Sequence, residues 1–195
     1  VTGVVDTLAS TPDGRYLAFG SADDRLILRE WATGKQHMVS GADVGRSTHL
    51  EFTADSRFLI TNDHNAIQFR SVPGLSLRQS LNPFGMHIQS FGLSPDGSRM
   101  VLGQHNGEIF VASMGKEPVR RPLKTRGELW FAGYLDDNQT VATGSSGAVQ
   151  VWQPQRWEPS VRVADSQPAP LQIGVFSAGD ALVGRDAAGV DVAWQ

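Results

Sequence analysis

The chain has 195 residues, a formal net charge of -3 and no cysteine. This length suits one domain, and the lack of cysteine excludes disulfides, thiol nucleophiles and thiolate metal sites. The small acidic excess disfavours a general nucleic-acid binder, which would normally be basic. Because no apolar run approaches the ~18 residues of a membrane span and no signal peptide opens the sequence, we expect a cytoplasmic protein without membrane insertion.

The stretch from Thr7 to Lys35 contains a unit that recurs along the chain. Its apolar strands are separated by a Pro-Asp-Gly turn at 12–14 and an Asp-Asp turn at 23–24. Proline fixes φ, aspartate bonds its own backbone and glycine accepts a positive φ, so these residues favour tight turns. The strands predicted in this first unit are one that ends at Ser10, then Tyr16–Phe19, Leu26–Arg29 and a more polar Gln36–Ser40.

The unit recurs four more times at a nearly constant spacing. First-strand ends are 41 or 42 residues apart, at Ser10, Phe52, Leu93, Tyr134 and Phe176. Third-strand ends are 40 to 42 residues apart, at Arg29, Arg70, Ala112, Trp152 and Trp194. The later strands predicted between these markers are, in chain order, Phe58–Thr61, Ala66–Phe69 and Ser76–Leu81; Arg99–Leu102, Glu108–Val111 and Val119–Leu123; Thr140–Ala142, Ala148–Trp152 and Ser160–Val163; and Ala181–Val183 and Val190–Trp194.

Many of these strands are apolar on successive residues, as in Met100-Val101-Leu102. A strand with one wet face would alternate, so such runs require cover on both faces. Four-stranded sheets stacked around an axis give that cover, and a period near 41 matches a propeller blade. The sequence therefore predicts an all-β fold, a single β-propeller domain over 1–195 with about five four-stranded antiparallel blades. Their approximate limits are 1–40, 41–81, 82–123, 124–164 and 165–195.

Two turn-and-strand stretches carry a family resemblance. Thr11-Pro12-Asp13-Gly14 with the strand after it, and Ser94-Pro95-Asp96-Gly97 with Arg99–Gly103, resemble the WD40 repeat. The terminal Trp-Asp pair is degenerate, however, and no Gly-His dipeptide occurs in the chain. Asp23 matches the family's turn aspartate, whose other equivalents here are His64, Asn106, Ser146 and Ala188. The family's Asp–His–Ser/Thr–Trp hydrogen-bond network is thus expected to be absent or fragmentary, and other propeller families with Pro-Asp-Gly turns stay open.

The blade number has a consequence of its own. WD40-like propellers usually have seven blades, so the resemblance implies that the chain is an incomplete part of a seven-bladed ring, with additional blades or domains in the parent chain. The broad apolar faces of the first and last blades would otherwise be exposed. A closed ring of five blades would need a strand from outside this sequence.

Side chains with catalytic or metal-binding potential are scattered. His37, His49, His64, His87 and His105 lie in different strands or turns, without a short-spaced metal motif. Asp63-His64 and His105-Asn106 occupy equivalent turns of neighbouring blades, but no third or fourth metal ligand accompanies them. We therefore predict no catalytic residue, metal or cofactor. The basic cluster of Arg120, Arg121, Lys124 and Arg126 is either a solvated strand edge or a contact for an acidic segment or a phosphate.

The WD40 resemblance implies a partner-binding face, built from the starts of the first strands and the turns between the second and third strands. Carried over to this chain, it gives the candidate partner-binding residues Arg46, Asp63, His87, His105, Glu128 and Trp130. Aromatic and forked cationic side chains such as Trp130 and Arg46 commonly anchor interfaces. The alternative for Trp130 is a core tryptophan beside Phe131.

By analogy with that family, the sequence favours a non-catalytic scaffold or sensing module of a larger, signalling protein. It would bind a protein or peptide through the propeller face, and not nucleic acid. The alternative is an enzymatic propeller, such as a hydrolase, lactonase or quinoprotein-like enzyme with a central-channel site. Such a site needs convergent acids, histidines or a metal, whereas Ala22, Ser145 and Ala187 supply none. A structural piece of a repeat array is the third interpretation.

Overall fold

A computed structural model describes residues 5–21, 23–41, 49–63, 66–81, 87–114, 116, 123–125, 127–135, 139–145, 148–153, 158–164, 172–175, 182–185 and 191–194. Over these ranges the chain forms strands, turns and bends and no helix. None of the described residues, accordingly, belongs to a helix of the length and apolarity that a bilayer crossing requires.

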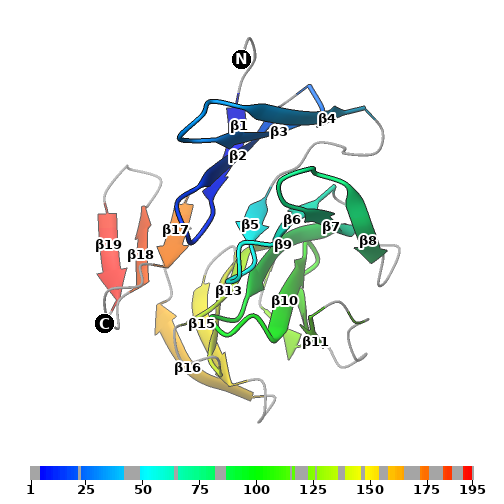
Figure 1. Cartoon of the computed structure of the whole chain (residues 1–195). Helices are drawn as coiled ribbons and strands as arrows, with labels where there is room; N and C mark the ends of the chain where they lie inside the picture. The colour runs from blue at the N-terminus through cyan, green and yellow to red at the C-terminus, as the bar shows by residue number, and fades with distance from the viewer. Residues whose placement is uncertain are drawn as a thin grey trace. The chain divides into compact units, whose positions relative to one another are not determined.

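The described strands form five separate antiparallel sheets, each a meander of strands consecutive in sequence (Figure 1). The first is β1 (Val5–Ser10), β2 (Tyr16–Ser21), β3 (Arg25–Glu30) and β4 (Gln36–Ser40). The second is β5 (Leu50–Phe52), β6 (Phe58–Asn62), β7 (Ile67–Ser71) and β8 (Leu77–Leu81). The third is β9 (Ile88–Leu93), β10 (Arg99–Gln104), β11 (Glu108–Ser113) and β12 (Leu123–Lys124). The last two are β13 (Leu129–Tyr134), β14 (Val141–Ser145), β15 (Ala148–Gln153) and β16 (Glu158–Ala164), then β17 (Gln172–Val175), β18 (Leu182–Arg185) and β19 (Asp191–Trp194).

These sheets confirm the all-β class and the four-stranded antiparallel blade. The first four first-strand ends fall where the sequence predicts them, at Ser10, Phe52, Leu93 and Tyr134. Third strands in the first four sheets run one residue beyond the predicted ends. In the first three sheets the added residue pairs with the start of the second strand, as in Tyr16↔Glu30, and in the fourth Gln153 pairs with Glu158 of β16. Phe176 and most of the predicted strand Val119–Leu123 lie outside the described residues.

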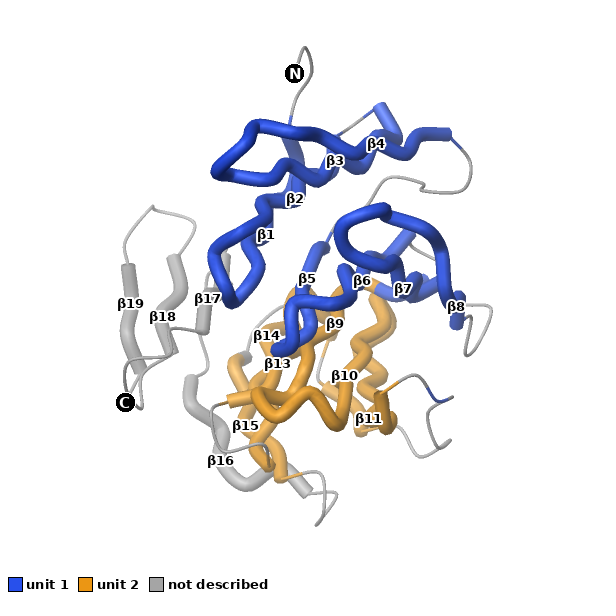
Figure 2. Tube along the Cα trace, in the orientation of Figure 1, with its two compact units in different colours: residues 1–88, 115–117 blue, residues 89–114, 118–195 orange. Residues whose placement is uncertain are grey.

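The chain divides into two compact units (Figure 2). Unit 1 comprises residues 1–88 and 115–117, and unit 2 comprises residues 89–114 and 118–195. The first two sheets belong to unit 1 and the other three to unit 2, apart from the first residue of β9. The single-domain organisation, the blade limits and the incomplete seven-bladed ring stay predictions.

In unit 1, one face of the first sheet forms a core with the second sheet. Ala18, Leu26 and Leu28 of the first sheet pack in one cluster with Leu50, Phe52, Leu59 and Leu75 of the second. The opposite face of the first sheet carries the cross-strand row Leu8–Phe19–Ile27–Met38. The end members of this row, Leu8 and Met38, are 59% and 58% exposed. The first blade thus presents one packed and one partly open apolar face.

In unit 2, the first strands of the third and fourth sheets approach each other closely without pairing. The hydroxyl of Ser90 on β9 accepts a hydrogen bond from Ala132 N on β13 at 3.2 Å and lies 3.5 Å from Ala132 O. A Cβ added to Gly92 would lie 2.8 Å from Gly133 Cα and 3.1 Å from Ala132 O. Only glycine fits at this distance, so Gly92 lets the inner strands of consecutive blades converge.

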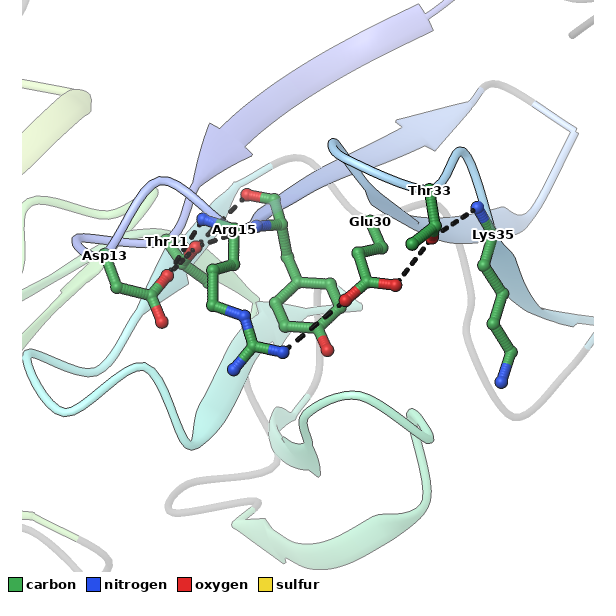
Figure 3. Close-up of polar contacts among 7 residues, drawn as sticks. Thr11, Asp13, Arg15, Glu30, Thr33 and Lys35 are labelled. Atoms are coloured by element: carbon green, nitrogen blue, oxygen red, sulfur yellow. Dashed lines mark hydrogen bonds and ion pairs between the residues drawn. The ribbon is translucent and has the colours of Figure 1, made fainter.

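A hydroxyl–carboxylate contact braces the turn between β1 and β2 (Figure 3). The Thr11 hydroxyl donates to Asp13 Oδ1 at 2.6 Å and accepts from Tyr16 N at 3.0 Å. Asp13 Oδ1 also accepts from Arg15 N at 3.0 Å. The pairs Thr53–Asp55 and Ser94–Asp96 repeat this arrangement in the next two sheets. In the fourth sheet Leu135, which has no hydroxyl, occupies this position, and Leu135 N donates to Thr140 O at 2.8 Å. We call the three braced turns the Asp turns.

The Asp turns should make stability fall in acid. Bonds from the neighbouring hydroxyl and from a backbone N–H hold the pKa of Asp13, Asp55 and Asp96 below the usual value. A carboxylate with a lowered folded pKa stabilises fully above its unfolded pKa of about 4, and this contribution is lost as pH falls through the folded value. Thermal unfolding between pH 7 and pH 2 should therefore show a steeper loss below about pH 4 for the wild type than for D13N/D55N/D96N. Parallel curves for the two proteins would contradict this account.

Candidate functional site

Three of the predicted partner-binding residues lie together in unit 2, where the turn after β10 meets the start of β13. His105 Nε2 is 3.5 Å from Glu128 Oε1, and both side chains are more than half exposed. Leu129 N donates to His105 O at 3.3 Å, which joins the turn to the strand. Trp130 is the second residue of β13. We call His105, Glu128 and Trp130 the unit 2 corner.

The backbone beneath this corner is tightly held. Thr125 N donates to Gly107 O at 2.9 Å, and the Thr125 hydroxyl lies 3.1 Å from Gly107 O and 3.2 Å from Gly127 O. Gly107 has a φ of 86°, and a Cβ there would lie 2.6 Å from Gly127 O. The Asn-Gly turn is therefore packed directly against the segment that leads into Glu128.

A β-bulge places Trp130 at the surface. Leu129 pairs with Ser145 and Phe131 pairs with Gly144, so Trp130 is the extra residue between two adjacent partners. Leu129 is 1% exposed and Phe131 packs against Ala142 and Val149, whereas Trp130 is 53% exposed. The alternative of a core tryptophan is therefore wrong. Bulges commonly re-aim a side chain beside functional sites.

The first sheet has the same irregularity at the equivalent place. Val5 pairs with Ser21 and Thr7 pairs with Gly20, which leaves Asp6 as the extra residue. Asp6 is exposed, as Trp130 is. In each of these two sheets the first strand thus begins with a bulged, exposed residue. The residue is an aspartate in the first sheet and a tryptophan in the fourth.

Asp63 and His87 lie at a corresponding corner in unit 1, on either side of a buried asparagine. Asn62 is fully buried; its Oδ1 accepts from His49 N at 2.9 Å, and its Nδ2 donates to Ile88 O at 3.2 Å. Asp63 Oδ1 accepts from Ala66 N at 2.7 Å, and Asp63 Oδ2 accepts from Gln68 Nε2 at 3.1 Å. The Asp63 carboxylate therefore shapes its own turn, while His87 is exposed before β9. Arg46, the sixth candidate, lies outside the described residues.

Sequence reasoning did not single out Asn62, although a polar residue at the end of an apolar strand is a signal for such a link. Asn62→Ala should lower the free energy of unfolding by about 2–3 kcal/mol, because two backbone groups lose their partner. Chemical denaturation followed by circular dichroism measures this loss. Asn106→Ala, which removes an exposed turn bond of 3.0 Å to Glu108 N, should cost less than about 1 kcal/mol. Equal losses in the two variants would contradict the role given to Asn62.

The comparisons with known proteins agree with the blades. A WD repeat-containing protein of Synechocystis, itself uncharacterized, is 27% identical over 99 residues, which is 51% of this chain and 28% of that protein. A WD repeat-containing protein of Schistosoma mansoni is 24% identical over 102 residues, 52% of this chain and 34% of that protein. The chain resembles WD-repeat proteins in sequence and in fold. No protein-family profile matches it.

The WD-repeat likeness confirms the resemblance that the sequence predicts, and it suggests a protein-interaction module. The matched stretch spans about a third or less of the length of these curated relatives. Neither relative carries a binding role in its name.

One WD-repeat contact survives in the fourth sheet. Trp152 Nε1 donates to Thr143 Oγ1 at 2.8 Å, and both residues are buried. At the equivalent place in the second sheet, buried Arg70 donates instead to Gln68 Oε1 at 2.7 Å and to Leu75 O at 3.2 Å. Among the described residues, the hydrogen-bond network of the WD repeat is thus present in part.

The remaining candidates are partly outside the described residues. His64, Arg120, Arg121 and Arg126 are among those, while Lys124 is exposed on β12. Across the ranges that the structure describes, no three histidine, aspartate or glutamate side chains gather as a metal-binding group.

Proposed function

We propose that this chain is a non-catalytic interaction module of a larger protein and that it binds a protein or peptide through its propeller face. The unit 2 corner would carry the main contact. The single observation that supports this most is Trp130, a large aromatic side chain that is 53% exposed on a strand whose neighbouring residue Leu129 is buried. A tryptophan so held gives much contact area for little lost entropy, as binding hot spots require.

The surroundings of Trp130 support the same proposal. Its neighbours His105 and Glu128 are polar and half-exposed, as in the rim of an interface. The bulge and the Thr125–Gly107 bonds fix the backbone below, so little ordering is needed on binding. No contact among the described residues favours the hydrolase, lactonase or quinoprotein-like alternative.

The test is a selection of peptides from a displayed library on the intact chain, followed by affinity measurements on the purified peptides. Trp130→Ala should weaken binding of the selected peptides at least about 30-fold, the effect of a hot spot worth about 2 kcal/mol. Trp31→Ala is the matched control, because Trp31 is 73% exposed on a turn of unit 1. Trp31→Ala should leave the affinity within about twofold of the wild type.

Both variants should keep the wild-type circular dichroism spectrum, since each removes an exposed side chain. A selection that yields no binder would overturn the proposal. So would binders that lose as much affinity with Trp31→Ala as with Trp130→Ala.

A further inference from the structure

The unit 2 corner combines an aromatic face with a carboxylate on one strand edge. Leu129 lies between Glu128 and Trp130 and is 1% exposed, while the residues on either side are more than half exposed. Glu128 directly precedes β13, and Trp130 is the extra residue of the bulge two positions later. Both side chains are therefore accessible to a ligand at the same corner.

The charge of this corner sets the ligand that it can accept. Glu128 is an exposed carboxylate, and Glu108 stands opposite Lys124 in the neighbouring hairpin. Tryptophan attracts cations through its ring face, and a carboxylate accepts hydrogen bonds from guanidinium or ammonium groups. An anionic ligand would be repelled by Glu128.

Resting on the proposed function, we propose that the unit 2 corner binds an arginine or lysine side chain of an extended peptide. The cation would lie over the Trp130 ring and bind the Glu128 carboxylate. His105, 3.5 Å from Glu128 Oε1, positions that carboxylate. Arginine fits better than lysine, because its planar group can stack on the ring and bind the carboxylate at once.

The other exposed tryptophan of the described residues, Trp31, follows a carboxylate that is paired with an arginine and provides an internal control. Trp31 N donates to Arg15 O, and the Arg15 guanidinium lies 5.3 Å from the Tyr16 ring centroid and 3.4 Å from Glu30 Oε1. The Glu30 carboxylate, which precedes Trp31 in sequence, is thus already paired with the Arg15 guanidinium, and Lys35 lies close by in sequence. A cationic peptide should therefore not bind at Trp31.

The experiment compares four peptides that share an extended Gly/Ser sequence and differ only at the centre, which is Arg, Lys, Gln or Glu. Binding to the intact chain is followed by NMR through the tryptophan indole N–H signals, assigned with Trp130→Phe and Trp31→Phe. The Arg peptide should shift the Trp130 signal, with affinity at least tenfold above that of the Gln peptide. The Glu peptide should leave the signal unmoved, and the Trp31 signal should stay unmoved throughout.

Glu128→Gln should weaken binding of the Arg peptide at least tenfold and abolish the preference for the Arg peptide over the Gln peptide. Glu30→Gln should leave both affinities unchanged. Raising the salt concentration should weaken binding of the Arg peptide, because the ion pair between its arginine and Glu128 would be exposed to solvent. Equal shifts from the Arg and Gln peptides would overturn the inference.

Library-selected peptides separate this inference from the function on which it rests. If they lose affinity with Trp130→Ala but not with Glu128→Gln, the interaction site stands and the cationic ligand is refuted. If neither change affects them, both proposals fail.

Discussion

Replacing Trp152 by alanine should lower the free energy of unfolding by about 3–5 kcal/mol, the usual cost of deleting a large buried aromatic side chain. Trp152 is 3% exposed and packs with Val101, Ile109 and Leu129 in the main core of unit 2. The substitution removes contacts that two blades share, so the cavity cannot close by a local shift. Denaturant unfolding followed by circular dichroism measures the loss.

Two milder variants separate volume from hydrogen bonding at this site. Trp152→Phe keeps most of the volume and should cost about 1 kcal/mol through the lost bond to Thr143. Thr143→Val leaves the Trp152 N–H buried without its acceptor and should cost about 1–3 kcal/mol. The double variant with Trp152→Phe and Thr143→Val should lose less free energy of unfolding than the sum of the two single losses. A loss below about 1 kcal/mol for Trp152→Ala would contradict the shared core.

Gly92→Val should be nearly as damaging, at about 3 kcal/mol, the upper end of the usual range for overpacking. The atoms that the new side chain would meet belong to the backbone of Gly133 and Ala132, at 2.8 and 3.1 Å. A backbone cannot rotate away as a flexible side chain can, so β9 and β13 must separate and the Ser90–Ala132 bond is lost. The melting temperature should fall by roughly 6–12 °C for a protein of this size.

Gly74→Ala is the control for this substitution. Gly74 is exposed in a turn of unit 1, and the nearest atom to an added Cβ is Ser76 Oγ at 3.7 Å. Its melting temperature should stay within about 2 °C of the wild type. If Gly92→Val were tolerated equally well, the close approach of the inner strands would be refuted.

Much of the fold can be predicted from the sequence, because the features that specify it are local. The Pro-Asp-Gly turns at 12–14 and 95–97 place the breaks between strands, and the apolar runs beside them set the burial. The structure adds why the turns recur: Thr11, Thr53 and Ser94 each brace the aspartate two residues later. The third-strand ends depend on pairing with neighbouring strands, so in the first four sheets each third strand runs one residue beyond its predicted end.

Less of the candidate site can be predicted from the sequence, because it depends on strand register and on contacts between blades. Whether Trp130 faces the core or the solvent follows from one bulged residue, and no local pattern marks that bulge. Asn62 links His49 to Ile88, which is 26 residues further along than Asn62 itself. Asp63 stays a predicted partner-binding residue; its carboxylate accepts bonds from Ala66 N and from the Gln68 amide on β7, which no local pattern indicates.

The packing of consecutive blades is the claim on which both the core and the unit 2 corner depend. Nuclear Overhauser effects between the α-protons of Gly92 and Gly133 test it most directly, since these residues are 41 positions apart and belong to different sheets. Because a Cβ on Gly92 would lie 2.8 Å from Gly133 Cα, a strong cross-peak is expected between them in the folded chain. If both glycine signals are assigned in the folded chain and this cross-peak is absent, the stacking of these blades is contradicted.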